Sequence, residues 1–73
     1  MKTYLTVFFS SEGASPSQVT DRLQMLGFVP THGNYDFVYN WDDKASVKDA
    51  IWFADKVRNT LEGMHVYFKV ESV

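Results

Sequence analysis

The side chains best suited to chemistry in this chain are two histidines, His32 and His65, and scattered carboxylates that include Asp36, Asp42 and Asp43. Imidazole and carboxylate groups bind zinc and act as acids and bases in enzymes. His32 and His65 fall in segments predicted to form opposite edges of one sheet, too far apart to share a metal ion. Asp42 and Asp43 are typical of a loop before a helix. We therefore expect no metal site within one chain, although a second chain could complete one.

Thiol chemistry is excluded because the chain has no cysteine, so disulfides and thiolate metal sites are excluded as well. No serine is accompanied by a histidine and a carboxylate placed to activate it, and no carboxylate pair lies in an evident apolar pocket. We expect no catalytic residue and no cofactor. If the chain is nevertheless an enzyme with its site at a subunit boundary, the first residues to test are His32, His65, Asp36 and Tyr39.

The serine-rich segment 10–15 precedes a predicted helix, where free backbone N–H groups can hold an anion. It contains no lysine or arginine, Glu12 would repel a phosphate, and the glycine spacing of a phosphate loop is missing. Ser15, Pro16 and Gln18 instead match a capping box with proline at the first helical position. The pattern therefore predicts a capped turn rather than a phosphate site.

The composition indicates a small acidic globular chain. It has 73 residues with a formal net charge of −2, and it contains six Phe, four Tyr and two Trp. Its charges form no basic cluster of the kind that binds nucleic acid, and no apolar run approaches the roughly 20 residues of a membrane span. Residues 1–9 alternate with Thr like a strand rather than a signal peptide. We expect a cytoplasmic protein without membrane contact.

The apolar pattern and the turn residues predict four strands and two helices. Gly33-Asn34 suits a two-residue hairpin turn, and Pro30, which lacks an N–H group, belongs on a sheet edge. In chain order, the expected elements are strand 2–9, helix 16–26, strand 28–32, strand 35–41, helix 46–62 and strand 65–70.

Two βαβ units with right-handed crossovers, joined through a hairpin, predict an α+β fold of the ferredoxin-like kind. In this βαββαβ sandwich the antiparallel sheet has strand order 4-1-3-2, and both helices cover one face. The sequence has no linker and no low-complexity stretch, so residues 1–73 are expected to form a single domain. A fold of this kind does not by itself imply a function.

The third predicted strand decides which face of the sheet is buried. If its rings faced outward, Asp36 and Asn40 would lie under the helices, at about 1–3 kcal/mol for each unpaired polar group. We therefore expect the rings to face inward. The strand residues predicted to face the helices are Leu5, Val7, Phe9, Tyr35, Phe37, Tyr39, Trp41, Val66, Phe68 and Val70. The apolar stripe of the second helix is predicted to be Val47, Ala50, Ile51, Ala54, Val57 and Leu61.

The opposite face of the sheet then carries a partly apolar patch, formed by Tyr4, Thr6, Phe8, Val38 and Tyr67. Trp52 lies away from the helical stripe, where a tryptophan can anchor an interface. Small domains often gain stability by association, and exposed apolar patches often bind partners. The simpler alternative is a set of ordinary half-exposed sheet residues. The sequence thus favours a non-enzymatic module that forms a homodimer or binds a protein partner, with room for a small ligand at the interface.

A second reading is single-stranded nucleic-acid binding, in which Tyr4, Phe8 and Tyr67 would stack bases as the sheet aromatics of RNA-recognition motifs do. Asp36 and Asn40 beside Val38 make a poor stacking platform, and the net negative charge removes the attraction to phosphates. We therefore do not expect nucleic acid as a partner. The third reading is the small-metabolite enzyme with its site at a subunit boundary.

Overall fold

The computed structural model describes residues 1–42 and 44–73, so the prediction that Asp43 is a loop residue lies outside the described part of the chain. The elements, in chain order, are β1 Lys2–Phe8, α1 Pro16–Met25, β2 Val29–Pro30, β3 Phe37–Asn40, α2 Val47–Leu61 and β4 Tyr67–Ser72. The predicted order of strands and helices is confirmed, with every strand except the last shorter than expected.

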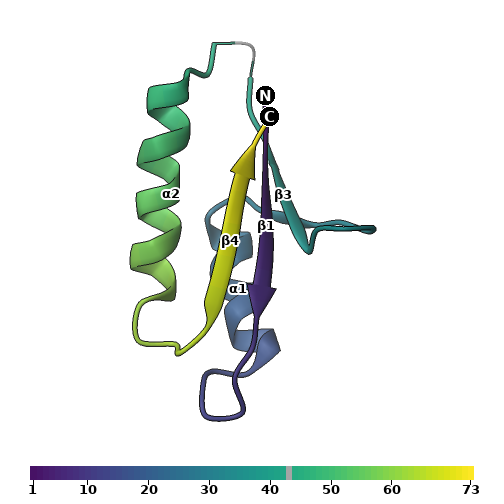
Figure 1. Cartoon of the computed structure of the whole chain (residues 1–73), viewed down its shortest axis with the longest axis vertical. Helices are drawn as coiled ribbons and strands as arrows, with labels where there is room; N and C mark the ends of the chain where they lie inside the picture. Colours follow the sequence, from purple (N-terminus) through teal and green to yellow (C-terminus); the bar gives the residue numbers. More distant parts are fainter. Residues whose placement is uncertain (43) are drawn as a thin grey trace.

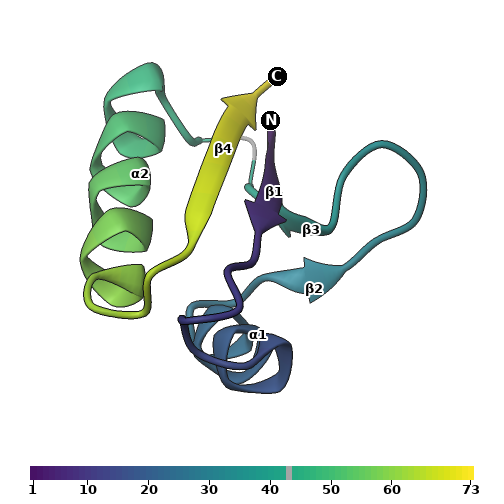
Figure 2. The same ribbon diagram turned by 60° about the horizontal axis from the view of Figure 1, so that its bottom comes forward.

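The strands form a four-stranded sheet in the order β2-β3-β1-β4, which is the predicted order read from its other edge (Figure 1). Each neighbouring pair is antiparallel. Both chain ends lie at the same end of the sheet, while the segment between β2 and β3 extends on the side away from α2 (Figures 1 and 2). The fold is therefore α+β with an open antiparallel sheet.

The first helix begins and ends where local signals place it. The Ser15 side chain accepts a hydrogen bond from the Gln18 N–H, while the Gln18 Oε1 accepts one from the Ser15 N–H at 2.9 Å, which completes a capping box. Val19 and Leu23 are buried on the inner face of the helix. The segment 10–15 is thus the capped turn that the sequence predicts.

The second helix is also capped, by Ser46 and Asp49, but it presents a different face to the sheet than the sequence pattern predicts. Phe53, Val57 and Leu61 are its buried residues. Val47 and Ile51, predicted to be inside, are exposed. Ile51 lies about 120° around the helix from Val57, whereas Phe53 lies about 40° from it. The predicted stripe omits Phe53, whose aromatic side chain packs in the core.

The core forms between the inner face of the sheet and both helices, and its buried residues are Leu5, Val7, Val19, Leu23, Phe28, Phe37, Phe53, Val57 and Leu61. Phe53 is at its aromatic centre, with ring centroids 5.3 Å from Phe28, 4.5 Å from Tyr39 and 5.2 Å from Trp41. The Trp41 Nε1–H donates to Thr3 Oγ1 at 2.7 Å, so the polar tip of this ring is satisfied at the rim of the core.

The predicted orientation of β3 is correct. Phe37 is buried, Tyr39 packs against the core and Asn40 is exposed, while Trp41, directly after the strand, also packs against the core. Two predictions beside the central strands are wrong. Phe9 is exposed because β1 ends at Phe8, and Tyr35 lies outside the sheet, on its other face.

Asp36 explains why β3 starts two residues later than predicted. Its backbone N–H donates to the Leu5 carbonyl at 3.0 Å, and its Oδ2 accepts the Val7 N–H at 2.9 Å. The carboxylate thus takes the position that a backbone carbonyl would occupy in a longer ladder. The register is that of a hairpin centred on Gly33-Asn34, but the strand pairing ends at Pro30 and Phe37, and Tyr35 leaves the sheet.

Candidate functional site

The outer face of the sheet, on the side opposite the helices, holds most of the residues predicted to bind a partner. Cross-strand register places Tyr4 between Val38 and Glu71, and Phe8 beside Tyr67. Thr6 is half-buried between these two positions. Tyr4, Thr6, Phe8, Val38 and Tyr67 therefore do share one face, as expected.

Tyr35 covers one end of this outer face. Its ring stacks on Tyr4 with a centroid distance of 4.4 Å and an interplanar angle of 25°. Its hydroxyl donates to Glu71 Oε2 at 2.6 Å, which ties the segment before β3 to the edge strand β4. The hydrogen bond to Glu71 raises the pKa of Tyr35 above its ordinary value, with smaller contributions from desolvation and from the nearby negative charge. Tyr4 is thereby withdrawn from the accessible patch.

Val38 is also less available than predicted. It lies between its cross-strand partners Tyr4 and Val29, and only 9% of its surface remains exposed. Its place on the outer face is as expected, but its packing there is that of a core residue. Tyr4 and Val38 therefore support the outer face rather than present themselves to a partner.

The open end of the outer face is formed by Phe8 and Tyr67. These residues are direct cross-strand partners on β1 and β4, and 56% and 77% of their surfaces are exposed. Two exposed aromatic side chains on neighbouring strands offer a large contact area at a low cost in side-chain entropy. We call Phe8 and Tyr67 the aromatic pair.

A hollow next to the aromatic pair is lined by Ser10, Glu12, His65, Val66 and Tyr67. A serine, a histidine and a carboxylate thus meet in one place, a grouping that the sequence did not predict. His65 is exposed and has a positive φ of 55°. Within the described residues no hydrogen bond joins His65 to Ser10 or Glu12, so the three do not form an activated nucleophile.

The two loops around this hollow are held against each other by backbone contacts. The Ala14 N–H donates to the Met64 carbonyl at 2.9 Å. A Cβ atom on Gly13 would lie 2.6 Å from the Met64 oxygen and 2.7 Å from the His65 oxygen, so only glycine permits this approach. These contacts fix His65 and Tyr67, at the start of β4, relative to the loop between β1 and α1.

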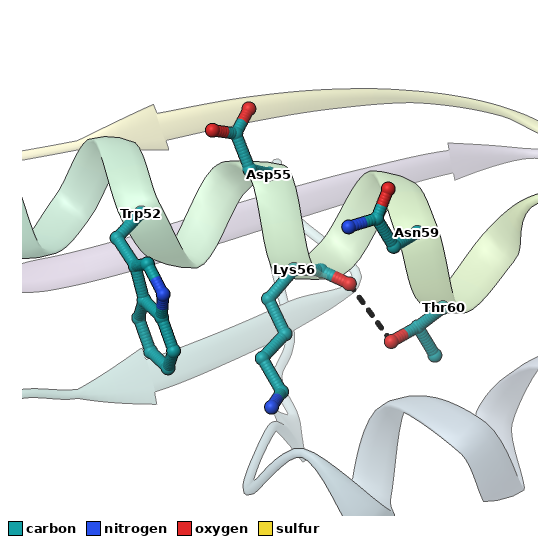
Figure 3. A pocket seen from close by; sticks show the side chains of 5 residues that line it. All are labelled: Trp52, Asp55, Lys56, Asn59 and Thr60. Atoms are coloured by element: carbon teal, nitrogen blue, oxygen red, sulfur yellow. Dashed lines mark hydrogen bonds between the residues drawn. The ribbon is translucent and has the colours of Figure 1, made fainter.

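Trp52 is exposed on α2 as predicted, with 61% of its surface accessible. It lines a shallow hollow together with Asp55, Lys56, Asn59 and Thr60 (Figure 3). The Lys56 Nζ lies 5.3 Å from the centre of the Trp52 ring, within the range of a cation–π interaction. Figure 3 shows the Lys56 side chain extending toward α1, whereas Asp55 points away from it. Trp52 is remote from the aromatic pair.

The remaining chemical candidates stay dispersed. His32 is exposed in the segment after β2, and His65 precedes β4, at the opposite edge of the sheet. Within residues 1–42 and 44–73, no group of three or more His, Asp or Glu side chains is arranged to hold a metal ion. Neither helix in the described part of the chain has the length and apolar character of a membrane-crossing segment.

Comparisons with protein-family models, with curated proteins and with solved structures give no match to this chain.

Sequence reasoning missed the role of Tyr35 and of its acceptor Glu71. One signal could have found it: Asp36 is a residue type depleted in strands, so the third strand could have been started after it. Tyr35 would then belong to the loop, free to fold over either face of the sheet. Nothing in the sequence indicates which face it takes, because the contact joins segments 36 residues apart.

Proposed function

We propose that this chain is a non-enzymatic cytoplasmic module that associates with protein through the outer face of its sheet, and that a second copy of the chain is its simplest partner. The observation that carries the proposal is the exposed aromatic pair, Phe8 and Tyr67, on the face opposite α1 and α2. The cytoplasmic placement rests on composition, because small secreted domains commonly depend on cysteines that this chain lacks.

The packing around the aromatic pair supports a binding role. The loop contacts of Gly13 and Ala14 hold the start of β4 in place, so the rings are presented from a fixed backbone. Rigid aromatic side chains on a fixed scaffold are typical of binding hot spots. We assign the strand order and the βαββαβ connectivity to the ferredoxin-like class, a likeness that implies no particular activity.

Nucleic-acid binding is the weaker alternative for the same surface. Tyr4, the aromatic residue of the central strand β1, is stacked under Tyr35 rather than free to receive a base. Glu12 and Glu71 lie at the two ends of the outer face, and Lys69 lies between them on the same face. The outer face therefore has no excess of positive charge to attract phosphates. The dispersed His32 and His65 likewise give no support to an enzyme site within one chain.

Sedimentation velocity across a concentration series tests the role of the aromatic pair. We expect the full chain to associate, and Phe8→Ser combined with Tyr67→Ser to weaken that association at least about tenfold, since hot-spot aromatics each contribute 1 kcal/mol or more. Met25→Ser is the matched control, because Met25 is 83% exposed on α1, away from the outer face. Equal association of all three proteins would contradict the proposal.

A further inference from the structure

The two edge strands of the sheet, β2 and β4, differ in how well they are protected against pairing with a further strand. β2 consists of only two residues, and one of them is Pro30, which cannot donate a ladder hydrogen bond. β4 forms the other edge with six residues, Tyr67–Ser72, and contains no proline. Natural proteins usually blunt an edge with short strands, proline or charged side chains, because an open edge is a template for another strand. The β2 edge has a short strand and proline, whereas β4 has only the charges of Lys69 and Glu71.

The free side of β4 can be assigned residue by residue. Lys2 and Val73 exchange both of their backbone hydrogen bonds, at 2.7 and 2.9 Å. Such pairs alternate along an antiparallel ladder, so Phe68, Val70 and Ser72 turn their N–H and C=O groups away from β1. Among the backbone hydrogen bonds that the described residues make outside the helices and strands, none uses these groups. They form an unpaired row along the edge.

We propose that a second copy of this chain pairs with this edge, β4 against β4, in antiparallel register about a two-fold axis at Val70. In this register Val70 lies opposite its own copy, and Phe68 lies opposite Ser72. Each of these pairs exchanges both N–H···O hydrogen bonds, so the outward groups of the three residues are all satisfied. The contact is isologous, as closed dimers require.

The charges on β4 favour this register over the registers shifted by two residues. Lys69 and Glu71 lie on the outer face, opposite Thr6 and Tyr4 of the same chain. In the proposed register Lys69 of each copy lies directly opposite Glu71 of the other, so the symmetry gives two opposite-charge pairs. A slip by two residues, the smallest that preserves the hydrogen-bonding pattern, sets Lys69 against Lys69 or Glu71 against Glu71. Like charges directly opposite each other are destabilising.

The contacts of Glu71 within its own chain are compatible with this arrangement. Its Oε2 accepts the Tyr35 hydroxyl, and a carboxylate has a second oxygen and further lone pairs for the incoming lysine. Phe68 and Val70 pack against the core from β4 but remain only partly buried. A partner strand would cover part of their remaining exposed surface. A foreign strand could also use the edge, but the alternation of Lys69 and Glu71 complements itself.

Pairing at this edge would place two aromatic pairs on one continuous surface. Residues directly opposite in an antiparallel sheet share a face, so the outer faces of both copies lie on the same side. The two Tyr67 side chains would be about 20 Å apart along the strand direction. The edge joins two copies, and their outer faces remain free for the association proposed above.

Sedimentation equilibrium on full-length chains that carry Phe8→Ser and Tyr67→Ser isolates the edge, because these substitutions remove the contact proposed for the outer face. We expect a dimer to persist in this background. Adding Lys69→Glu should weaken dimerisation at least about tenfold, because both opposite-charge pairs become like-charge pairs. Adding Lys48→Glu is the matched control, since it makes the same charge change on exposed α2 and should leave the dimer intact.

A mixing experiment tests the register itself. In the same Phe8→Ser/Tyr67→Ser background, Glu71→Lys should also weaken dimerisation at least about tenfold, whereas an equimolar mixture with the Lys69→Glu chain should restore it, because acidic and basic side chains then face each other at both positions. Circular dichroism verifies that each chain is folded before mixing. A mixture that stays monomeric, or a Lys69→Glu chain that dimerises as well as its parent, would overturn the edge pairing. A monomeric Phe8→Ser/Tyr67→Ser chain beside an associating wild-type chain would overturn the edge pairing while leaving the outer-face proposal standing.

Discussion

Replacing Phe53 by alanine tests how α2 is oriented on the sheet. Only 4% of the Phe53 surface is exposed, and its ring contacts three aromatic neighbours, the nearest being Tyr39 at 4.5 Å. Substitution of a buried Phe by Ala costs about 3–5 kcal/mol, and the aromatic contacts favour the upper half of that range. A domain of this length has roughly 4–11 kcal/mol of total stability, so Phe53→Ala removes between about two fifths and all of it.

Ile51 is the matched control for Phe53 on the same helix. Because 62% of its surface is exposed, Ile51→Ala should change the free energy of unfolding by no more than about 0.5 kcal/mol. Urea unfolding followed by tryptophan fluorescence measures both variants, since Trp41 packs 5.2 Å from the Phe53 ring. With a slope near 1 kcal/mol per molar urea, Phe53→Ala should lower the midpoint by about 3 M or more.

A milder substitution keeps the test informative if Phe53→Ala fails to fold. Phe53→Leu retains most of the volume and loses the ring contacts, so it should cost roughly 1–2 kcal/mol. The reasoning would be refuted if Ile51→Ala destabilised the protein more than Phe53→Leu. That result would mean that the helix is rotated to the orientation predicted from its apolar stripe.

Three further predictions concern single contacts. In a spectroscopic tyrosinate titration, Tyr35 should ionise at higher pH than an ordinary tyrosine, and Glu71→Ala should return its pKa toward 10.0. Because the folded pKa is the raised one, the stabilisation from this contact is complete below about pH 10 and is lost as pH rises through the folded pKa. Thr3→Val should cost about 1–3 kcal/mol in urea unfolding, because it leaves the half-buried Trp41 N–H without its 2.7 Å acceptor. Gly13→Ala should lower the thermal midpoint, because the new Cβ would meet two backbone carbonyl oxygens within 2.7 Å.

Each of these three contacts has its own control or contrary outcome. Tyr35→Phe should remove the late-ionising tyrosine, and its persistence in that variant would assign it elsewhere. Thr6→Val on the outer face should be nearly neutral, and equal losses for Thr3 and Thr6 would contradict the buried hydrogen bond. An increase in stability for Gly13→Ala, as expected from a stiffer unfolded chain alone, would show that the two loops do not touch.

The features that could be predicted from the sequence are those set by near neighbours or by general rules of connection. Ser15, Pro16 and Gln18 identify the start of α1 because a capping box involves residues only three apart. Right-handed crossovers limit the strand order to the one found. The orientation of β3 followed from the cost of burying Asp36 and Asn40. Phe37 is buried, as that reasoning requires.

The features that could not be predicted depend on contacts distant in sequence. Two apolar stripes on α2 share Ala50, Ala54, Val57 and Leu61. The predicted stripe adds Val47 and Ile51, which are exposed, whereas the observed one adds Phe53. The choice is made by the aromatic rings that the other elements bring opposite the helix.

The outer face shows the same limitation. Tyr35 left the predicted strand because Asp36 bonds to Val7, nearly 30 residues earlier in the chain. Phe9 is exposed because the pairing of β1 with β4 ends at Phe8 and Tyr67. The patch predicted from alternation alone therefore included Tyr4 and Val38, which are covered, beside the two rings that remain open.

The association of this chain with protein is tested most directly by the mass of the wild-type chain at sedimentation equilibrium, measured from micromolar to near-millimolar concentration. One chain has a mass of 8.4 kDa. We predict that the weight-average mass rises with concentration toward at least twice that value and falls again on dilution. A mass that stays at 8.4 kDa over the whole range would contradict self-association through either the outer face or the β4 edge.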